Sequence, residues 1–100
     1  MPKIRHGCLV NIKYEDGSQE FREFFDEAKK MADAIPLVKE HHQYRQTDEA
    51  CPYGYGFVQE FDSEEDFKEF SDHPLHKEYG EKYWTAGVID FMDFDFEEFD

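Results

Sequence analysis

Imidazole side chains are the groups of this 100-residue chain that can gain or lose a proton near neutral pH. His73 and His76 stand three residues apart, a spacing at which two histidines can act as bases or share a metal ion. Pro74 interrupts that spacing, and no third ligand is evident. His41 and His42 are adjacent, so on a strand they point to opposite faces and cannot share one ion. We therefore expect no metal site and no cofactor.

Each of these histidines also has a purely structural interpretation. His76 can tie the start of a helix to a sheet, and His73, which precedes Pro74, is expected to cap a helix or make a turn. His6 lies in an apolar run and can be a core histidine whose nitrogens are both satisfied. The sequence leaves the structural and chemical roles of His76 and His6 open.

Composition predicts one folded domain over residues 1–100 and excludes several classes of partner. Hydrophobic residues make up 39% of the chain and aromatic residues 18%, which is enough apolar surface for a small core. The net charge of -14 argues against nucleic acid and against anionic membrane surfaces. No apolar run is long enough to span a membrane, and no leader is apparent. Cys8 and Cys51 do not suggest a disulfide framework, so we expect a cytoplasmic protein.

The first half of the chain changes its hydrophobic period once. Residues 4–13 alternate with a period of two, which predicts a strand with His6 and Cys8 on the same face. A turn follows, and Ser18 is placed to cap a helix whose apolar stripe includes Phe24. Pro36 ends this helix. The stripe is expected to form the core, and part of it could line a cavity.

The second half predicts two more strands, two helices and a last strand. Residues 37–45 form a weak polar strand, and residues 54–61 a stronger one with Tyr55, Phe57, Gln59 and Phe61 on one face. Ser63 is the expected cap of the next helix, and Pro74 suits the first turn of another. Residues 87–96 form the last strand. The order β-α-β-β-α-α-β predicts an α+β plait, with helices on one face of an antiparallel sheet.

The last strand carries apolar side chains on both of its faces. Alternation places Val88, Met92, Phe94 and Phe96 on one face, and Ile89 and Phe91 on the other. Helices can cover one face of the sheet, but a 100-residue chain has nothing left to cover the second. We expect a homodimer packed sheet to sheet, a dimeric α+β barrel. The alternative is a monomer with scattered exposed apolar residues.

Three segments of this sequence resemble the stress-responsive A/B barrel (Dabb) domain family. They are residues 5–13 (Arg-His-Gly-Cys-Leu-Val-Asn-Ile-Lys), residues 54–65, and His73-Pro74-Leu75-His76 followed by Tyr79, Tyr83 and Trp84. The last is the most specific, and residues 36–52 match least. The resemblance implies a ferredoxin-like fold and a dimer whose sheets form a barrel.

The resemblance also implies a cavity between sheet and helices. The family includes a polyketide cyclase with a catalytic His-Tyr pair; His76 matches its histidine, whereas Phe70 replaces the tyrosine and cannot donate a proton. An aspartate of the last strand orients the histidine in that enzyme, and Asp93 is our candidate for it. If the register of the last strand differs from the one we expect, Asp90 or Asp95 takes this place instead. The remaining expected ligand contacts are His6, Tyr55, Phe57, Phe70, Phe24 and Tyr79.

Three functions compete on these grounds. The first is a dimeric Dabb protein whose cavity binds a small apolar or carbonyl ligand. The second is a cyclase-like or isomerase-like enzyme that uses His76 as a general base. The third, a related dimeric plait such as a cofactor-free monooxygenase or a haem-degrading enzyme, fits worst, because the His-Pro-x-His step does not belong to those families.

Overall fold

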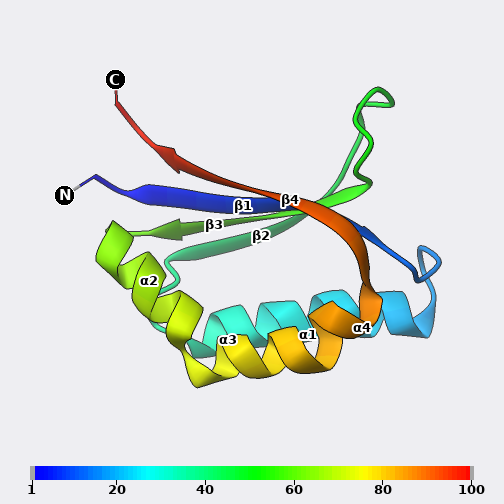
Figure 1. Cartoon of the computed structure of the whole chain (residues 1–100), viewed down its shortest axis with the longest axis horizontal. Helices are drawn as coiled ribbons and strands as arrows, with labels where there is room; N and C mark the ends of the chain where they lie inside the picture. Colours follow the sequence, from blue (N-terminus) through cyan, green and yellow to red (C-terminus); the bar gives the residue numbers. More distant parts are fainter. Residues whose placement is uncertain (1, 100) are drawn as a thin grey trace.

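The computed structural model describes residues 2–99, which fold into a four-stranded antiparallel sheet with helices on one side (Figure 1). The elements in chain order are β1 (Ile4–Ile12), α1 (Gln19–Ala34), β2 (Glu40–Arg45), β3 (Tyr55–Phe61), α2 (Glu64–Asp72), α3 (Pro74–Tyr79), the π-helical turn η1 (Gly80–Trp84), α4 (Thr85–Gly87) and β4 (Val88–Glu97). This order confirms the α+β plait predicted from hydrophobic periodicity.

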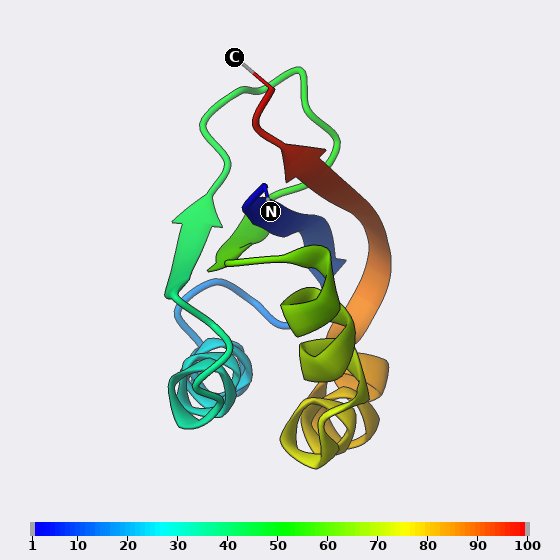
Figure 2. The same ribbon diagram turned by 90° about the vertical axis from the view of Figure 1, so that its left-hand side faces the viewer.

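The sheet has the strand order β2-β3-β1-β4, so β1 and β3 are its central strands. All of the helices lie beneath one face of this sheet (Figures 1 and 2). Figure 2 shows α1 under the β2 side, and α2 and α3 under the side of β1 and β4. In the described part of the chain, no helix lies on the opposite face. Among residues 2–99, no helix has both the length and the apolar character needed to cross a membrane.

Local signals in the sequence set the helix ends. The Ser18 side chain accepts a hydrogen bond from the Phe21 N–H at 3.2 Å and begins α1, and Ser63 does the same for α2 by accepting from the Asp66 N–H at 3.2 Å. His73 ends α2 and begins α3, where its Nδ1 accepts from the Leu75 N–H at 3.1 Å. The capping roles predicted for these three residues are confirmed.

Two strand predictions need correction. β2 begins at Glu40 rather than at residue 37, because Pro36 and Leu37 form a turn and Val38 packs against the core. In β4, the register shifts between Asn11 and Ile12 of the partner strand, so strict alternation fails at its start. Val88 therefore packs against the helix-side core rather than sharing the outer face with Met92.

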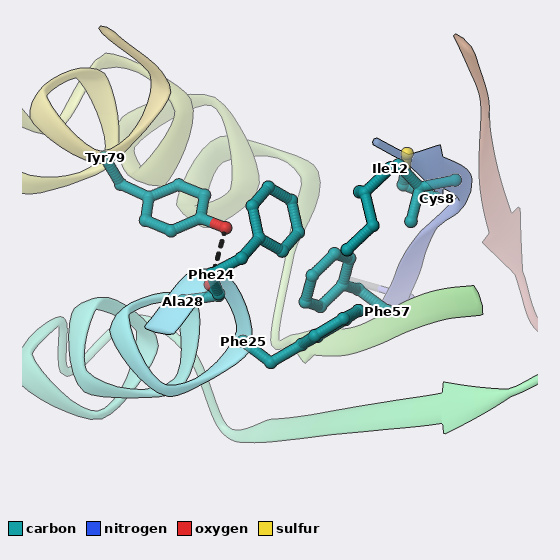
Figure 3. Close-up of a cluster of buried hydrophobic side chains, with 8 residues drawn as sticks. Cys8, Ile12, Phe24, Phe25, Ala28, Phe57 and Tyr79 are labelled. Atoms are coloured by element: carbon teal, nitrogen blue, oxygen red, sulfur yellow. Dashed lines mark hydrogen bonds between the residues drawn. The ribbon is translucent and has the colours of Figure 1, made fainter. Parts of the chain in front are cut away.

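Aromatic rings fill the space between sheet and helices. One cluster joins side chains of β1, α1, β3 and α3, of which Figure 3 labels Cys8, Ile12, Phe24, Phe25, Ala28, Phe57 and Tyr79. The Tyr79 hydroxyl donates a hydrogen bond to the Phe24 carbonyl at 3.0 Å, which fixes α3 against α1. A second cluster of Ile35, Phe61 and Phe70 lies where α2 packs against β3. Burial of each fully buried phenylalanine in these clusters contributes about 1.5–3 kcal/mol to the stability of the fold.

Candidate functional site

A hollow of about 350 Å³ lies between the helix-facing side of the sheet and helices α1, α2 and α3. Its wall is mostly aromatic and apolar, with a few polar groups. The lining residues are His6, Cys8, Ala28, Met31, His41, Phe57, Gln59, Phe67, Phe70, Ser71, His76, Tyr79, Gly80, Trp84, Phe91 and Asp93. Among the residues expected to contact a ligand, His6, Phe57, Phe70 and Tyr79 lie on this wall together with His76.

His76 is held in one tautomer by the backbone of the preceding helix. Its Nδ1–H donates to the Ser71 carbonyl at 3.1 Å, and its ring packs on Phe70 with a centroid separation of 4.6 Å. Burial lowers the pKa of His76 below its ordinary value, an effect that the Ser71 carbonyl partly offsets. The imidazole is therefore neutral near pH 7, and Nε2 is left as an acceptor.

The three candidate aspartates of β4 contact groups other than His76. Asp93 lines the hollow, but its effect is on Cys8: burial raises the pKa of this thiol well above its usual range, and the Asp93 carboxylate raises it further. Asp95 bonds to His6 at 2.6 Å, and Asp90 accepts from Asn11. Because the Ser71 carbonyl of α2 already holds His76 Nδ1, this nitrogen is not available to any of the three aspartates.

His6 forms the other imidazole of the wall. Its Nδ1 is 2.6 Å from the Asp95 carboxylate, and its ring packs on Phe67 with a centroid separation of 4.6 Å. The strand register places Asp95 directly opposite His6 across the β1–β4 pair. The sequence put His6 on the correct face, but the aspartate that binds it follows only from the register.

Tyr55 and Phe24 lie away from the hollow, contrary to expectation. The Tyr55 hydroxyl donates to Asp16 at 2.9 Å, and Arg45 binds the same carboxylate. Tyr55 shares a strand face with Phe57, but it lies at the far end of that face, where a turn supplies its partner. Phe24 is 1% exposed and packs among Phe25, Phe57, Tyr79 and Trp84, so it supports the wall from behind.

His41 and Gln59 form a pair in the wall that the sequence did not single out. The Gln59 amide nitrogen donates to His41 Nδ1 at 2.9 Å, and His41 Nε2–H donates to the Gln43 side chain at 2.9 Å. Burial lowers the pKa of His41, which keeps the ring neutral in this arrangement. The available signal was Gln59 itself, a polar residue on a strand face that is otherwise aromatic.

The π-helical turn brings Trp84 into the wall. Tyr79 and Trp84 are five residues apart, and in an α-helix they would point about 140° away from each other. The wider turn of η1 places both on the side of the hollow, where the Trp84 ring meets Phe91 edge to face with a centroid separation of 5.5 Å. Such turns within helices frequently accompany functional sites. Among residues 2–99, no group of three or more metal-binding side chains is close enough to hold an ion.

Comparison with known proteins supports the fold. A Dabb family protein with a ferredoxin-like fold from Mesorhizobium loti is 29% identical over the whole of both chains, with a TM-score of 0.95. A dimeric ferredoxin-like protein from Thermobifida fusca is 21% identical over 97% of this chain and 92% of the other, with a TM-score of 0.80. Hydroxynitrile lyase from Passiflora edulis is 15% identical over 99% of this chain and 95% of the other, with a TM-score of 0.86.

No curated protein matches the sequence significantly. The profile of the stress responsive A/B barrel domain matches residues 4–98, nearly the full length of the chain. The predicted family is confirmed, and this chain belongs to the stress responsive A/B barrel (Dabb) domain family.

Proposed function

We propose that this chain is a homodimeric small-molecule-binding protein whose hollow beneath the sheet takes a small, largely apolar ligand. The hollow itself carries the proposal. Its volume of about 350 Å³ falls in the range of small-molecule sites, and its wall combines aromatic rings with a few polar groups. The free thiols of Cys8 and Cys51 fit a reducing compartment such as the cytoplasm.

The dimer part of the proposal rests on the helix-free face of the sheet. Met92 and Phe96 are 54% and 60% exposed there, and Phe94 lies over Gly7 of the neighbouring strand. Leu9 and Val58 continue this apolar surface across β1 and β3. A second copy would cover the surface by symmetry, and the relative from Thermobifida fusca is described as dimeric.

An enzyme that uses His76 as a general base is the second candidate. The neutral tautomer of His76, with Nε2 free to accept a proton, favours it. An aldol-type reaction also needs a donor for the oxyanion that forms. Phe70 offers none, the Tyr79 hydroxyl already donates to the Phe24 carbonyl, and the indole N–H of Trp84 is a much weaker acid than a tyrosine hydroxyl. Binding is therefore better supported than catalysis.

The test uses Trp84, the single tryptophan of the chain, as a reporter in the wall. Bromobenzene, whose bromine quenches indole fluorescence on contact, should quench Trp84 saturably. Gly80 lines the hollow, and a Cβ added to it meets no atom within 4 Å, so there is room for a larger side chain at this position. Gly80→Leu should therefore occupy part of the hollow and weaken this binding. Ala86→Leu adds an apolar side chain at an exposed position of α4 and is the control. Linear, non-saturable quenching, or equal binding by both variants, would overturn the proposal.

A further inference from the structure

The amide oxygen of Gln59 faces the hollow without a partner. Gln59 is 6% exposed, and its amide nitrogen is committed to His41. Among the described residues, every fully buried side-chain nitrogen or oxygen has a hydrogen-bond partner, whereas no partner is found for the Gln59 oxygen. This oxygen must therefore touch open space, and the open space beside Gln59 is the hollow.

His41 fixes which end of the Gln59 amide the hollow meets. Both ring nitrogens of His41 are used: Nδ1 accepts from Gln59, and Nε2–H donates to Gln43. With His41 Nε2–H donating to the Gln43 oxygen, turning over the Gln59 amide alone would place its oxygen against the lone pair of Nδ1 and lose a hydrogen bond; the reverse arrangement requires the Gln43 amide and the His41 proton to change as well. The His41 ring thus holds the Gln59 oxygen toward the ligand.

The other polar groups of the wall are mostly acceptors as well. His76 offers Nε2, and Asp93 offers a carboxylate. The hydroxyls of Tyr79 and Ser71 already donate to the carbonyls of Phe24 and Phe67, and the indole N–H of Trp84 remains as a donor. No lysine or arginine is among the lining residues, and His6 is already paired with Asp95.

We infer that the hollow selects an uncharged ring compound that carries a hydroxyl group, and that this hydroxyl donates to the Gln59 amide oxygen, which His41 holds in position. The inference rests on the proposed function and names the class of ligand. A ligand with only acceptor groups would leave the buried Gln59 oxygen unpaired, which is costly. An anion would meet Asp93 and a chain of net charge -14 without a cation to balance it.

Three naphthalenes of similar shape test the choice by isothermal titration calorimetry. 2-Naphthol carries the donor, 2-methoxynaphthalene keeps the oxygen without the hydrogen, and 2-naphthoate is an anion at neutral pH. We expect 2-naphthol to bind about tenfold more tightly than 2-methoxynaphthalene, and 2-naphthoate to bind most weakly. If either comparison compound binds as tightly as 2-naphthol, the inference is wrong. If none of the three binds, the proposed function falls with it.

Variants locate the origin of the preference. Gln59→Leu should bring 2-naphthol and 2-methoxynaphthalene to equal affinity, whereas Gln46→Leu makes the same exchange outside the hollow and should keep the difference. His41→Phe leaves the Gln59 amide free to turn, so the affinity ratio of the two compounds should shrink even though the Gln59 side chain is intact. A ratio that is unchanged in His41→Phe would show that His41 does not position Gln59. This variant also serves if Gln59→Leu does not fold.

Discussion

Gly87 and Gly80 lie near the two ends of the segment that follows α3, and the space around them differs sharply. A Cβ added to Gly87 would come within 2.8 Å of Tyr14 and 3.2 Å of the buried Phe24 ring, whereas one added to Gly80 meets nothing within 4 Å. Gly87→Ala should therefore destabilise the fold by about 1–3 kcal/mol. Gly80→Ala should raise stability by up to about 1 kcal/mol, because alanine loses less backbone entropy in a helix. Urea denaturation of both variants checks this contrast, and equal losses would contradict it.

The buried neutral state of His76 makes stability depend on pH. Because burial lowers its pKa in the folded protein, the unfolded chain binds the proton more readily. The contribution of His76 to the free energy of unfolding is therefore fully present above about pH 6.5, the pKa in the unfolded chain. It is lost as the pH falls through the lower pKa of the folded protein. His76→Asn removes the titrating group but keeps an N–H donor that can reach the Ser71 carbonyl.

Unfolding free energies at pH 7.5 and pH 5.5 test this linkage. The loss of stability on acidification should be smaller in His76→Asn than in the original protein. Part of the loss should remain in the variant, because burial also lowers the pKa of His41. The same loss in both proteins would show that the His76 ring is not a buried neutral group.

Individual site residues were predictable only in part. Alternation assigns a side chain to a face of the sheet, and it placed Phe57 and His6 correctly, but it does not say how far along that face the hollow extends. Tyr55 was misplaced for this reason, since its partner Asp16 comes from a turn that is distant in sequence. The oxygen of Gln59 could not be foreseen, because its direction depends on the His41 ring of a neighbouring strand.

At the scale of elements, the Ser63 cap links helix stability to the geometry of the site. Helix α2 carries Phe70, which packs on His76, and Ser71, whose carbonyl holds the His76 ring. Ser63→Ala removes the acceptor of the Asp66 N–H and should cost about 1 kcal/mol. Ser63→Asp keeps an acceptor at this position and should restore most of the loss. Thermal unfolding followed by circular dichroism distinguishes the two variants, and equal melting temperatures would contradict the capping role.

Most elements could be predicted because their signals are local. The caps Ser18 and Ser63 and the breaks at Pro36 and Pro74 act on the residues beside them. The shift of register near Asn11 and the π-helical turn after Tyr79 are different, because they depend on how β4 and the last helices fit the rest of the fold. These irregularities place Val88 and Trp84, and a hydrophobic period cannot report them.

For the molecule as a whole, the two faces of the sheet divide the proposed tasks. The helix-facing side holds the hollow, and the opposite side carries the apolar surface that we assign to the dimer. Each chain has a net charge of -14, so two copies repel one another at long range. The apolar contact between them must outweigh this repulsion, and added salt, which screens it, should strengthen the dimer.

Phe96→Glu tests the apolar surface directly. A carboxylate placed at this exposed site of β4 would have to leave water in a sheet-to-sheet dimer, and the Arg5 guanidinium opposite it is already paired with Glu60, so the dissociation constant should rise at least tenfold. Leu75→Glu makes a matched exchange on the exposed surface of α3 and should leave association unchanged. Analytical ultracentrifugation at micromolar concentration gives the comparison, and a monomeric original protein would overturn the dimer. Because the hollow lies on the other face of the sheet, the monomeric variant should still bind 2-naphthol with the original affinity; its loss would mean that a second copy completes the binding site.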